Sequence, residues 1–129
     1  MGIFCKNYFM NNKQTGKYGE ELAAGFLIKK GYKILETNYR YSKMAEIDII
    51  ALKSNTIHFI EVKTRNGKTY GAPLEAITKT KLNSIYRCAK FYLSKTKTFY
   101  KQMQIDAIGI LIDNNKEPEF NFVENISLN

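Results

Sequence analysis

Apolar positions recur with a helical period in two segments of this 129-residue chain. In residues 16–30, Tyr18, Leu22 and Phe26 are spaced four residues apart, and Gly31 follows as a stop signal. In residues 78–93 the repeating apolar positions are Leu82, Ile85, Ala89 and Tyr92. The spacing predicts one helix in each segment.

Five other segments have the composition of β-strands. Residues 45–52 and 56–63 are rich in β-branched and aromatic side chains and flank the turn Lys53-Ser54-Asn55. Further strands are predicted over residues 32–41, 104–112 and 119–126. The order α-β-β-β-α-β-β indicates a mixed sheet flanked by helices, in the α/β or α+β class. We predict a flexible arm over the polar residues 1–15 and a single domain over residues 16–129.

The central hairpin gathers charged residues at its open end. If it closes on Ser54-Asn55, Asp48 lies opposite Glu61, and Glu46 lies opposite Lys63. Because side chains alternate along a strand, these four share one face. The other face carries Ile47, Ile49, Ala51, His58, Ile60 and Val62, which reads as a core face.

Two carboxylates facing each other on paired strands repel, so Asp48 and Glu61 need a proton or a cation between them. The chain has a single histidine, His58, so a metal here would be held by oxygen ligands. Such a site favours Mg²⁺ or Mn²⁺. The alternative is a solvated sheet face on which Glu46 and Lys63 form a cross-strand ion pair.

Composition narrows the choice of partner and compartment. The net charge of +8 and the pI near 9.4 favour a polyanionic partner, nucleic acid first and an anionic membrane surface second, although a merely basic protein has the same charge. No apolar run reaches the length of a membrane span, and no signal peptide is evident, so a cytoplasmic protein is expected. Cys5 and Cys88 are too isolated to suggest a disulfide scaffold or a zinc site.

Asp48, followed thirteen residues later by Glu61-Val62-Lys63, resembles the D…(D/E)xK core of the PD-(D/E)xK nuclease superfamily. More specifically, the chain resembles the YraN family of small bacterial proteins, which is similar to Holliday-junction resolvases. The blocks that carry this resemblance are Gly19-Glu20…Ala23, Gly31-Tyr32, Asn38-Tyr39-Arg40, Glu46-Ile47-Asp48-Ile49-Ile50-Ala51, Glu61-Val62-Lys63-Thr64-Arg65 and Tyr70-Gly71. One departure is Ala45, where the family often has glycine.

The resemblance implies a restriction-endonuclease-like fold and assigns roles by position. Asp48 and Glu61 would be metal ligands, with the Val62 carbonyl as a further donor, and Lys63 would be the catalytic lysine. Glu20, which helical geometry places on the flank of the buried face, would be an additional ligand, directly or through water. Glu46 would either tune Lys63 or touch the metal.

Basic residues near the proposed site are candidates for phosphate contacts. They are Arg40, Arg65, Lys68 and Lys81, of which Lys81 projects toward the Ile85, Cys88 and Tyr92 side of its helix. Each one has the alternative of being an ordinary solvated charge. His58 and Asp106 are expected to be structural.

These features predict a Mg²⁺- or Mn²⁺-dependent endonuclease that hydrolyses phosphodiester bonds in DNA, in branched or flapped substrates of repair or recombination. A homodimer would suit a junction-cutting enzyme. The first alternative is a nucleic-acid-binding or scaffold protein that retains the fold without turnover. The second is a protein-interaction module that docks a partner on its charged face.

Overall fold

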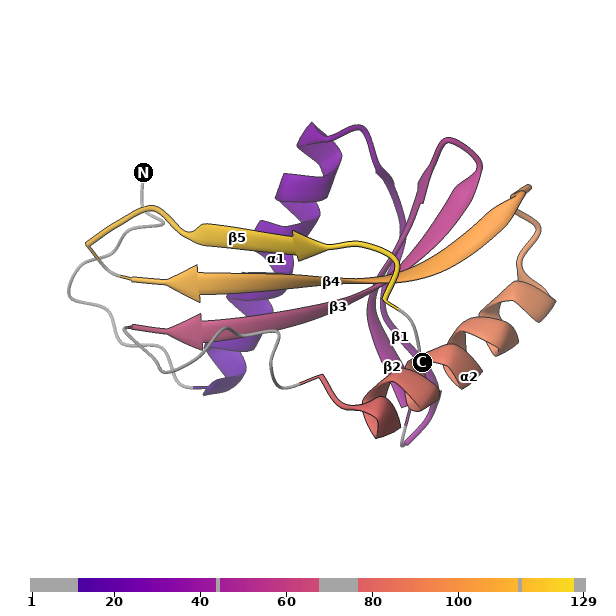
Figure 1. Ribbon diagram of the computed structural model, residues 1–129, viewed down its shortest axis with the longest axis horizontal. Coiled ribbons are helices and arrows are strands. Elements are labelled where there is room, and N and C mark those ends of the chain that lie inside the picture. Colours follow the sequence, from indigo (N-terminus) through magenta and orange to yellow (C-terminus); the bar gives the residue numbers. More distant parts are fainter. Residues whose placement is uncertain (1–11, 44, 68–76, 114, 127–129) are drawn as a thin grey trace.

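Figure 1 shows the architecture of the computed structural model, in which a helix packs on each face of a five-stranded sheet. The structure describes residues 12–43, 45–67, 77–113 and 115–126. Its elements are α1 (Asn12–Lys29), β1 (Lys33–Ser42), β2 (Ala45–Lys53), β3 (Thr56–Asn66), α2 (Lys79–Lys95), β4 (Gln102–Ile112) and β5 (Glu119–Val123). The α+β class and the element order predicted from the sequence are confirmed.

The first helix begins at Asn12, four residues earlier than predicted. Residues 12–15, assigned to a flexible arm, are therefore helical, while residues 1–11 lie outside the described part of the chain. Thr15 is buried, although it is polar. Apolar periodicity could not reveal this first turn because its buried residue is not apolar.

The strand order is β1-β2-β3-β4-β5, and every neighbouring pair is antiparallel except the parallel pair β3–β4, which α2 connects. The β2–β3 hairpin closes on Ser54 and Asn55, whose positive φ angles of 51° and 65° are those of a type I′ turn. The pairing runs from Lys53↔Thr56 to Ile49↔Ile60, in the predicted register. The short turn thus fixes which residues of the two strands face each other.

The hairpin separates immediately beyond Ile49 and Ile60. β2 continues along β1, pairing Ile47 with Tyr39, whereas β3 continues along β4, pairing Glu61 with Ala107. Figure 1 shows β1 and β2 turning away from β3 and β4 at this point. Asp48 lies where β2 and β3 separate, a point that we call the fork. Its Oδ2 accepts a hydrogen bond from the backbone N–H of Val62 at 2.8 Å. A carboxylate therefore replaces the next backbone partner between the two strands.

Two apolar clusters cover the two faces of the sheet. On one face α2 packs its buried residues Leu82, Ile85, Cys88, Ala89 and Tyr92 against Ile50, Ile57 and Phe59. On the other face Ala23 and Leu27 of α1 pack against Ile49, Ala51, Ile60, Ile108 and Ile110. Ile47 belongs to the α2 cluster rather than with Ile49 and Ala51, so its predicted face is wrong. Strict alternation ends where β2 leaves β3.

Cys88 is enclosed between α2 and the first two strands. Its Sγ lies 3.8 Å from the Tyr39 carbonyl oxygen and 3.9 Å from that of Ala45. Burial raises the pKa of the Cys88 thiol above its usual value. Its role in the described structure is that of a small core residue.

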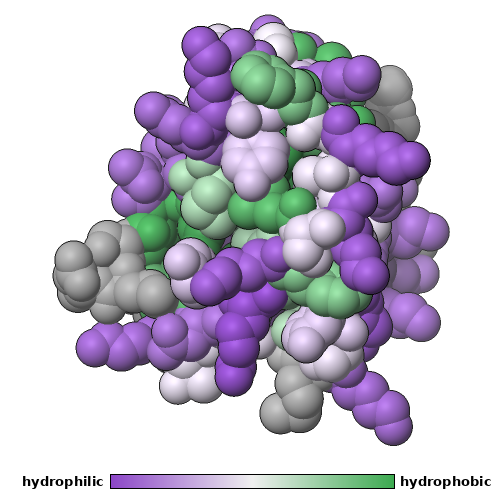
Figure 2. All heavy atoms as spheres, turned by 90° about the vertical axis from the view of Figure 1, so that its right-hand side faces the viewer, coloured by the Kyte–Doolittle hydropathy of each residue, from purple (hydrophilic) through white to green (hydrophobic). Residues whose placement is uncertain are grey.

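The surface keeps several large apolar side chains. Figure 2 shows the side of the molecule where α2 ends, with hydrophobic groups visible between hydrophilic ones. Tyr41, Tyr86 and Phe99 are among the exposed aromatic residues. Within the described ranges, no helix combines the length and the apolar character needed to cross a membrane.

The C-terminal segment is attached to the sheet through the buried Asp106. Its Oδ2 lies 2.6 Å from Nδ1 of His58, and its Oδ1 accepts hydrogen bonds from Gln104 Nε2 and the Asn125 backbone N–H, both at 2.8 Å. Asp106 is fully buried and His58 is 5% exposed. These three partners satisfy a carboxylate that burial would otherwise make costly. The structure supports the prediction that both residues are structural.

Replacing Asp106 with alanine should destabilise the fold by about 3 kcal/mol or more, because three polar groups lose their partner in a buried environment. Glu119→Ala, on the exposed edge strand β5, is the control and should change the free energy of unfolding by less than about 0.5 kcal/mol. Urea denaturation measures both. Equal stabilities of the two variants would contradict a structural role for Asp106.

Candidate active site

A cavity of about 570 Å³ lies where β2 and β3 separate. α1 contributes Thr15, Gly16 and Glu20 to its lining, and β2 contributes Asp48. The remaining lining residues come from β3 and are Glu61, Val62, Lys63, Thr64, Arg65 and Asn66. The cavity therefore contains the Asp48, Glu61 and Lys63 set predicted from the sequence, together with Glu20.

Asp48 and Glu61 form a close acidic pair in this cavity. The pKa of Asp48 is raised to about 7, first by burial and then by the charge of Glu61. The Val62 N–H and the charge of Lys81 act in the opposite direction without cancelling the rise. Asp48 thus keeps its proton below about pH 7 unless a cation replaces that proton.

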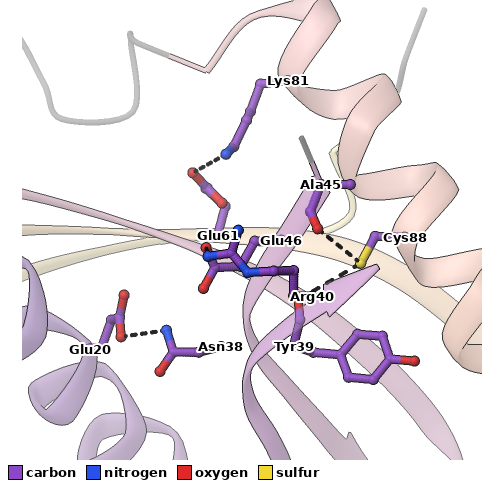
Figure 3. A network of polar contacts seen from close by, with 9 residues as sticks. All are labelled: Glu20, Asn38, Tyr39, Arg40, Ala45, Glu46, Glu61, Lys81 and Cys88. Atoms are coloured by element: carbon purple, nitrogen blue, oxygen red, sulfur yellow. Dashed lines mark hydrogen bonds and ion pairs between the residues drawn. The ribbon is translucent and has the colours of Figure 1, made fainter. Parts of the chain in front are cut away.

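The two carboxylate oxygens of Glu61 differ in their polar contacts. Its side chain is 6% exposed, and Oε2 lies 3.6 Å from Lys81 Nζ and 4.0 Å from Lys63 Nζ. Oε1 is buried and has no hydrogen-bond partner. Figure 3 shows the Glu61 carboxylate directed toward Lys81 of α2. A buried carboxylate oxygen without a donor is an open coordination position for a hard cation.

Glu20 approaches the cavity from the opposite side, on α1. It accepts a hydrogen bond from Asn38 Nδ2 at 2.9 Å, and burial raises its pKa, with the charges of Asp48 and Glu46 adding to the rise. In Figure 3 its carboxylate points to Asn38, well apart from Lys81. Glu20 lines the same cavity as the acidic pair, but in this structure Asn38 holds it.

A very close approach between α1 and β3 fixes the position of Glu20. A Cβ added to the neighbouring Gly19 would meet Thr64 Oγ1 at 2.0 Å and Thr64 Cβ at 3.0 Å. Only glycine leaves room for the helix at this distance from the strand. The glycine before Glu20 therefore has a packing function that also serves the site.

Glu46 does not pair with Lys63 as the extended hairpin register predicted. Its Oε1 binds Nη2 of Arg40 at 3.1 Å, and 32% of its side chain is exposed. The reason is the separation of the strands, since β2 at Glu46 is paired with β1 at Arg40. This exposed contact also occupies the Arg40 guanidinium.

The other basic candidates divide into three cases. Lys81 reaches the site from the first turn of α2, as its helical position predicted. Arg65 lines the cavity, with Nη1 3.4 Å from the Thr64 carbonyl oxygen. Lys68 lies outside the described residues.

Asn38 is a residue of the site that the spacing of charged residues did not predict. Its neighbours Thr37 and Tyr39 pair with Ile49 and Ile47, so Asn38 lies opposite Asp48 on the adjacent strand. Its φ of 52° is left-handed, a conformation that asparagine tolerates better than most residues. The available signal was its place in the block Asn38-Tyr39-Arg40, which carries part of the family resemblance.

A second group of polar residues lies away from this cavity. His58, Asp106 and Glu124 bring one potential ligand atom each within 4.8 Å of one another, the sole such trio in the part of the chain that is described. The oxygens of Asp106 already take part in three contacts, with His58, Gln104 and the Asn125 backbone N–H. Those contacts account for the buried His58 and Asp106, whereas Glu124 is exposed.

Gly19→Ala should destabilise the protein by about 1–3 kcal/mol, because the new methyl group must push α1 away from Thr64. Gly25→Ala is the matched control in the same helix, where an added Cβ meets no atom within 4 Å. This control should stabilise the protein by about 0.5–1 kcal/mol through its higher helix propensity. Thermal and urea unfolding give both values, and two changes of the same sign would contradict the close approach.

In metal-free protein, the raised pKa of Asp48 should make stability fall as the pH rises from about 4 to about 7. In that range the folded state retains a proton that the unfolded state has released, so the slope is negative, by up to roughly 1.4 kcal/mol per pH unit. Asp48→Asn should remove this component, whereas Asp113→Asn should leave it. Urea unfolding from pH 4 to 8 in EDTA measures the slopes, and identical slopes for wild type and Asp48→Asn would refute the assignment.

Comparison with known sequences identifies the family of the chain. Residues 19–110 match the model of the uncharacterised protein family UPF0102. A UPF0102 protein of Syntrophomonas wolfei is 41% identical over 105 residues, which are 81% of this chain and 90% of that protein. One from Clostridium botulinum is 47% identical over 103 residues, covering 79% and 83% of the two chains. The matched region includes every lining residue of the acidic cavity except Thr15 and Gly16, and the protein belongs to the UPF0102, or YraN-like, family.

Proposed function

We propose that this protein is a metal-dependent phosphodiesterase that cleaves DNA, with branched or flapped molecules as its substrates. The observation that carries the proposal is the buried pair Asp48 and Glu61, in which one oxygen of Glu61 has no partner and the pKa of Asp48 is raised to about 7. Such a pair is costly unless a cation completes it. The resemblance to the PD-(D/E)xK nucleases adds support from the sequence.

The donor set fits Mg²⁺ or Mn²⁺. Asp48 and Glu61 offer hard carboxylate oxygens, and the neighbouring Val62 carbonyl is a further candidate donor. The Val62 N–H holds Asp48 Oδ2, so the carboxylate is oriented before any ion arrives. A divalent cation bound there would polarise the scissile phosphate and help to generate hydroxide from water.

The lysines supply the remaining chemistry of the proposed reaction. Lys63 lies 4.0 Å from Glu61 and lines the cavity, where its ammonium group can stabilise charge developing on the phosphate and orient the attacking water. Lys81, which lies 3.6 Å from Glu61, and Arg65, which lines the cavity, would bind flanking phosphates. Glu20 acts as an outer acidic group that orders water, since Asn38 holds its carboxylate.

The net charge of +8 supports a nucleic-acid substrate, because a basic surface brings the phosphate backbone to an acidic centre. Electrostatic attraction does not distinguish DNA from a merely polyanionic partner.

With Mg²⁺ or Mn²⁺, purified protein should cleave flap or four-way-junction DNA faster than linear duplex or single-stranded DNA. Lys63→Ala and Asp48→Asn should each lower the rate by at least about 100-fold, and EDTA should abolish it. The matched controls Lys29→Ala and Asp113→Asn, which lie outside the cavity lining, should retain the rate.

Metal binding supplies a readout that does not depend on turnover. Mn²⁺ should raise the unfolding temperature of wild type and of Lys63→Ala, but not that of Asp48→Asn, because a ligand that binds only the folded state stabilises it. Equal cleavage rates in wild type, Lys63→Ala and Asp48→Asn would refute the catalytic proposal. Salt-dependent DNA binding without cleavage would instead favour a scaffold that has kept the fold.

A further inference from the structure

The longest acid-free part of the chain includes α2. From residue 76 to residue 105 there are seven lysines and arginines and no aspartate or glutamate. The apolar stripe of α2 faces the sheet, whereas Arg87, Lys90 and Lys95 are exposed. All charged residues on the outer face of this helix are therefore positive, which complements the negative charge of a phosphate backbone.

Aromatic rings lie among these cations. Tyr41 of β1 contacts Phe91 with ring centroids 4.5 Å apart, and Lys95 Nζ lies 5.5 Å from the centre of the Phe91 ring. One turn earlier, Lys90 Nζ lies 5.4 Å from the centre of the Tyr86 ring. Tyr41 is 49% exposed and Tyr86 is 39% exposed. We call this surface the aromatic-basic face, made of Tyr41, Tyr86, Arg87, Lys90, Phe91 and Lys95.

The aromatic-basic face contains a hollow of about 280 Å³, lined by Thr80, Asn83, Tyr86 and Arg87. It combines an exposed ring with amide, hydroxyl and guanidinium groups. Those are the groups that stack on a nucleobase and hydrogen-bond its edges. A purely hydrophobic partner would leave these polar groups without partners.

α2 connects this face to the acidic cavity. Lys81, in the first turn of the helix, lies 3.6 Å from Glu61, and Lys95 ends the helix. A helix of 17 residues extends about 25 Å. A strand bound along α2 would therefore lead toward the acidic pair.

We propose that the aromatic-basic face binds single-stranded DNA and directs it toward the Asp48–Glu61 cavity. This inference rests on the proposed function for its link to cleavage, but it concerns binding alone. Single-stranded DNA fits better than duplex because its unstacked bases can reach Tyr41 and Tyr86, whereas the bases of a duplex are stacked on each other. The single-stranded arm of a flapped substrate has this chemistry.

The charge component is tested with the double variant Arg87→Glu/Lys90→Glu. The probe is fluorescein-labelled oligo(dT), and fluorescence anisotropy is measured in EDTA over a range of salt concentrations. Affinity should fall by about tenfold or more, and the dependence of log affinity on log salt should become shallower by roughly 1.4, since two phosphate contacts are lost.

The matched control Lys29→Glu/Lys116→Glu makes the same change in net charge at exposed positions in α1 and in the β4–β5 connection. It should retain most of the affinity. Equal losses in the two double variants would overturn the proposal, because only overall charge would then matter.

The stacking component is tested at Tyr86. Tyr86→Ala should lower oligo(dT) affinity by about fivefold or more with little change in the salt slope, whereas Tyr86→Phe keeps the ring and should bind like wild type. Circular dichroism verifies that the exposed substitutions leave the fold intact. An unchanged affinity for Tyr86→Ala, or binding to oligo(U) that is tighter than to oligo(dT), would overturn the proposal.

The binding proposal and the nuclease proposal can be refuted independently of each other. If wild type binds oligo(dT) through this face but cleaves no DNA with metal present, the binding inference stands and the nuclease proposal falls. If wild type cleaves DNA while the Arg87, Lys90 and Tyr86 variants bind oligo(dT) as wild type does, the aromatic-basic face is not the binding surface and the nuclease proposal stands.

Discussion

The separation of β2 from β3, which forms the acidic cavity, depends on the hydrogen bond from the Val62 N–H to the Asp48 carboxylate. From the turn to Ile49 and Ile60, β2 and β3 pair as a regular antiparallel hairpin. Beyond these residues β2 pairs only with β1, and β3 pairs only with β4. A fork of this kind would leave backbone groups unpaired unless a side chain took their place. By accepting one of these bonds, Asp48 both completes the fork and fixes a carboxylate in the lining of the cavity.

The charge balance of the cavity follows from this geometry. Glu61 leaves the fork on the strand that stays with β4, close enough to raise the pKa of Asp48. Lys63 and Lys81 approach only one oxygen of Glu61, so the lysines compensate the acidic pair incompletely. Such partial compensation differs from a structural salt bridge, in which both oxygens usually find donors. It leaves a negative position for which a hard cation is the natural complement.

The sequence predicted those features that local chemistry determines. The Ser54-Asn55 turn set the hairpin register, and helical spacing identified the buried stripe of α2 and the approach of Lys81. The Glu46–Lys63 pairing was wrong because the separation of the strands depends on how each packs against its outer neighbour, which no local pattern encodes. The helical turn at residues 12–15 and the contact between Asn38 and Glu20 likewise depend on tertiary packing.

The burial of Cys88 gives the protein a built-in reporter of local opening. Its thiol is covered by the backbone of Tyr39 and Ala45, and its raised pKa keeps the reactive thiolate scarce. An alkylating reagent can reach the sulfur only when α2 lifts from β1 and β2. Because the same helix holds Lys81 beside Glu61, the alkylation rate of Cys88 measures how often the acidic pair loses this neighbouring lysine.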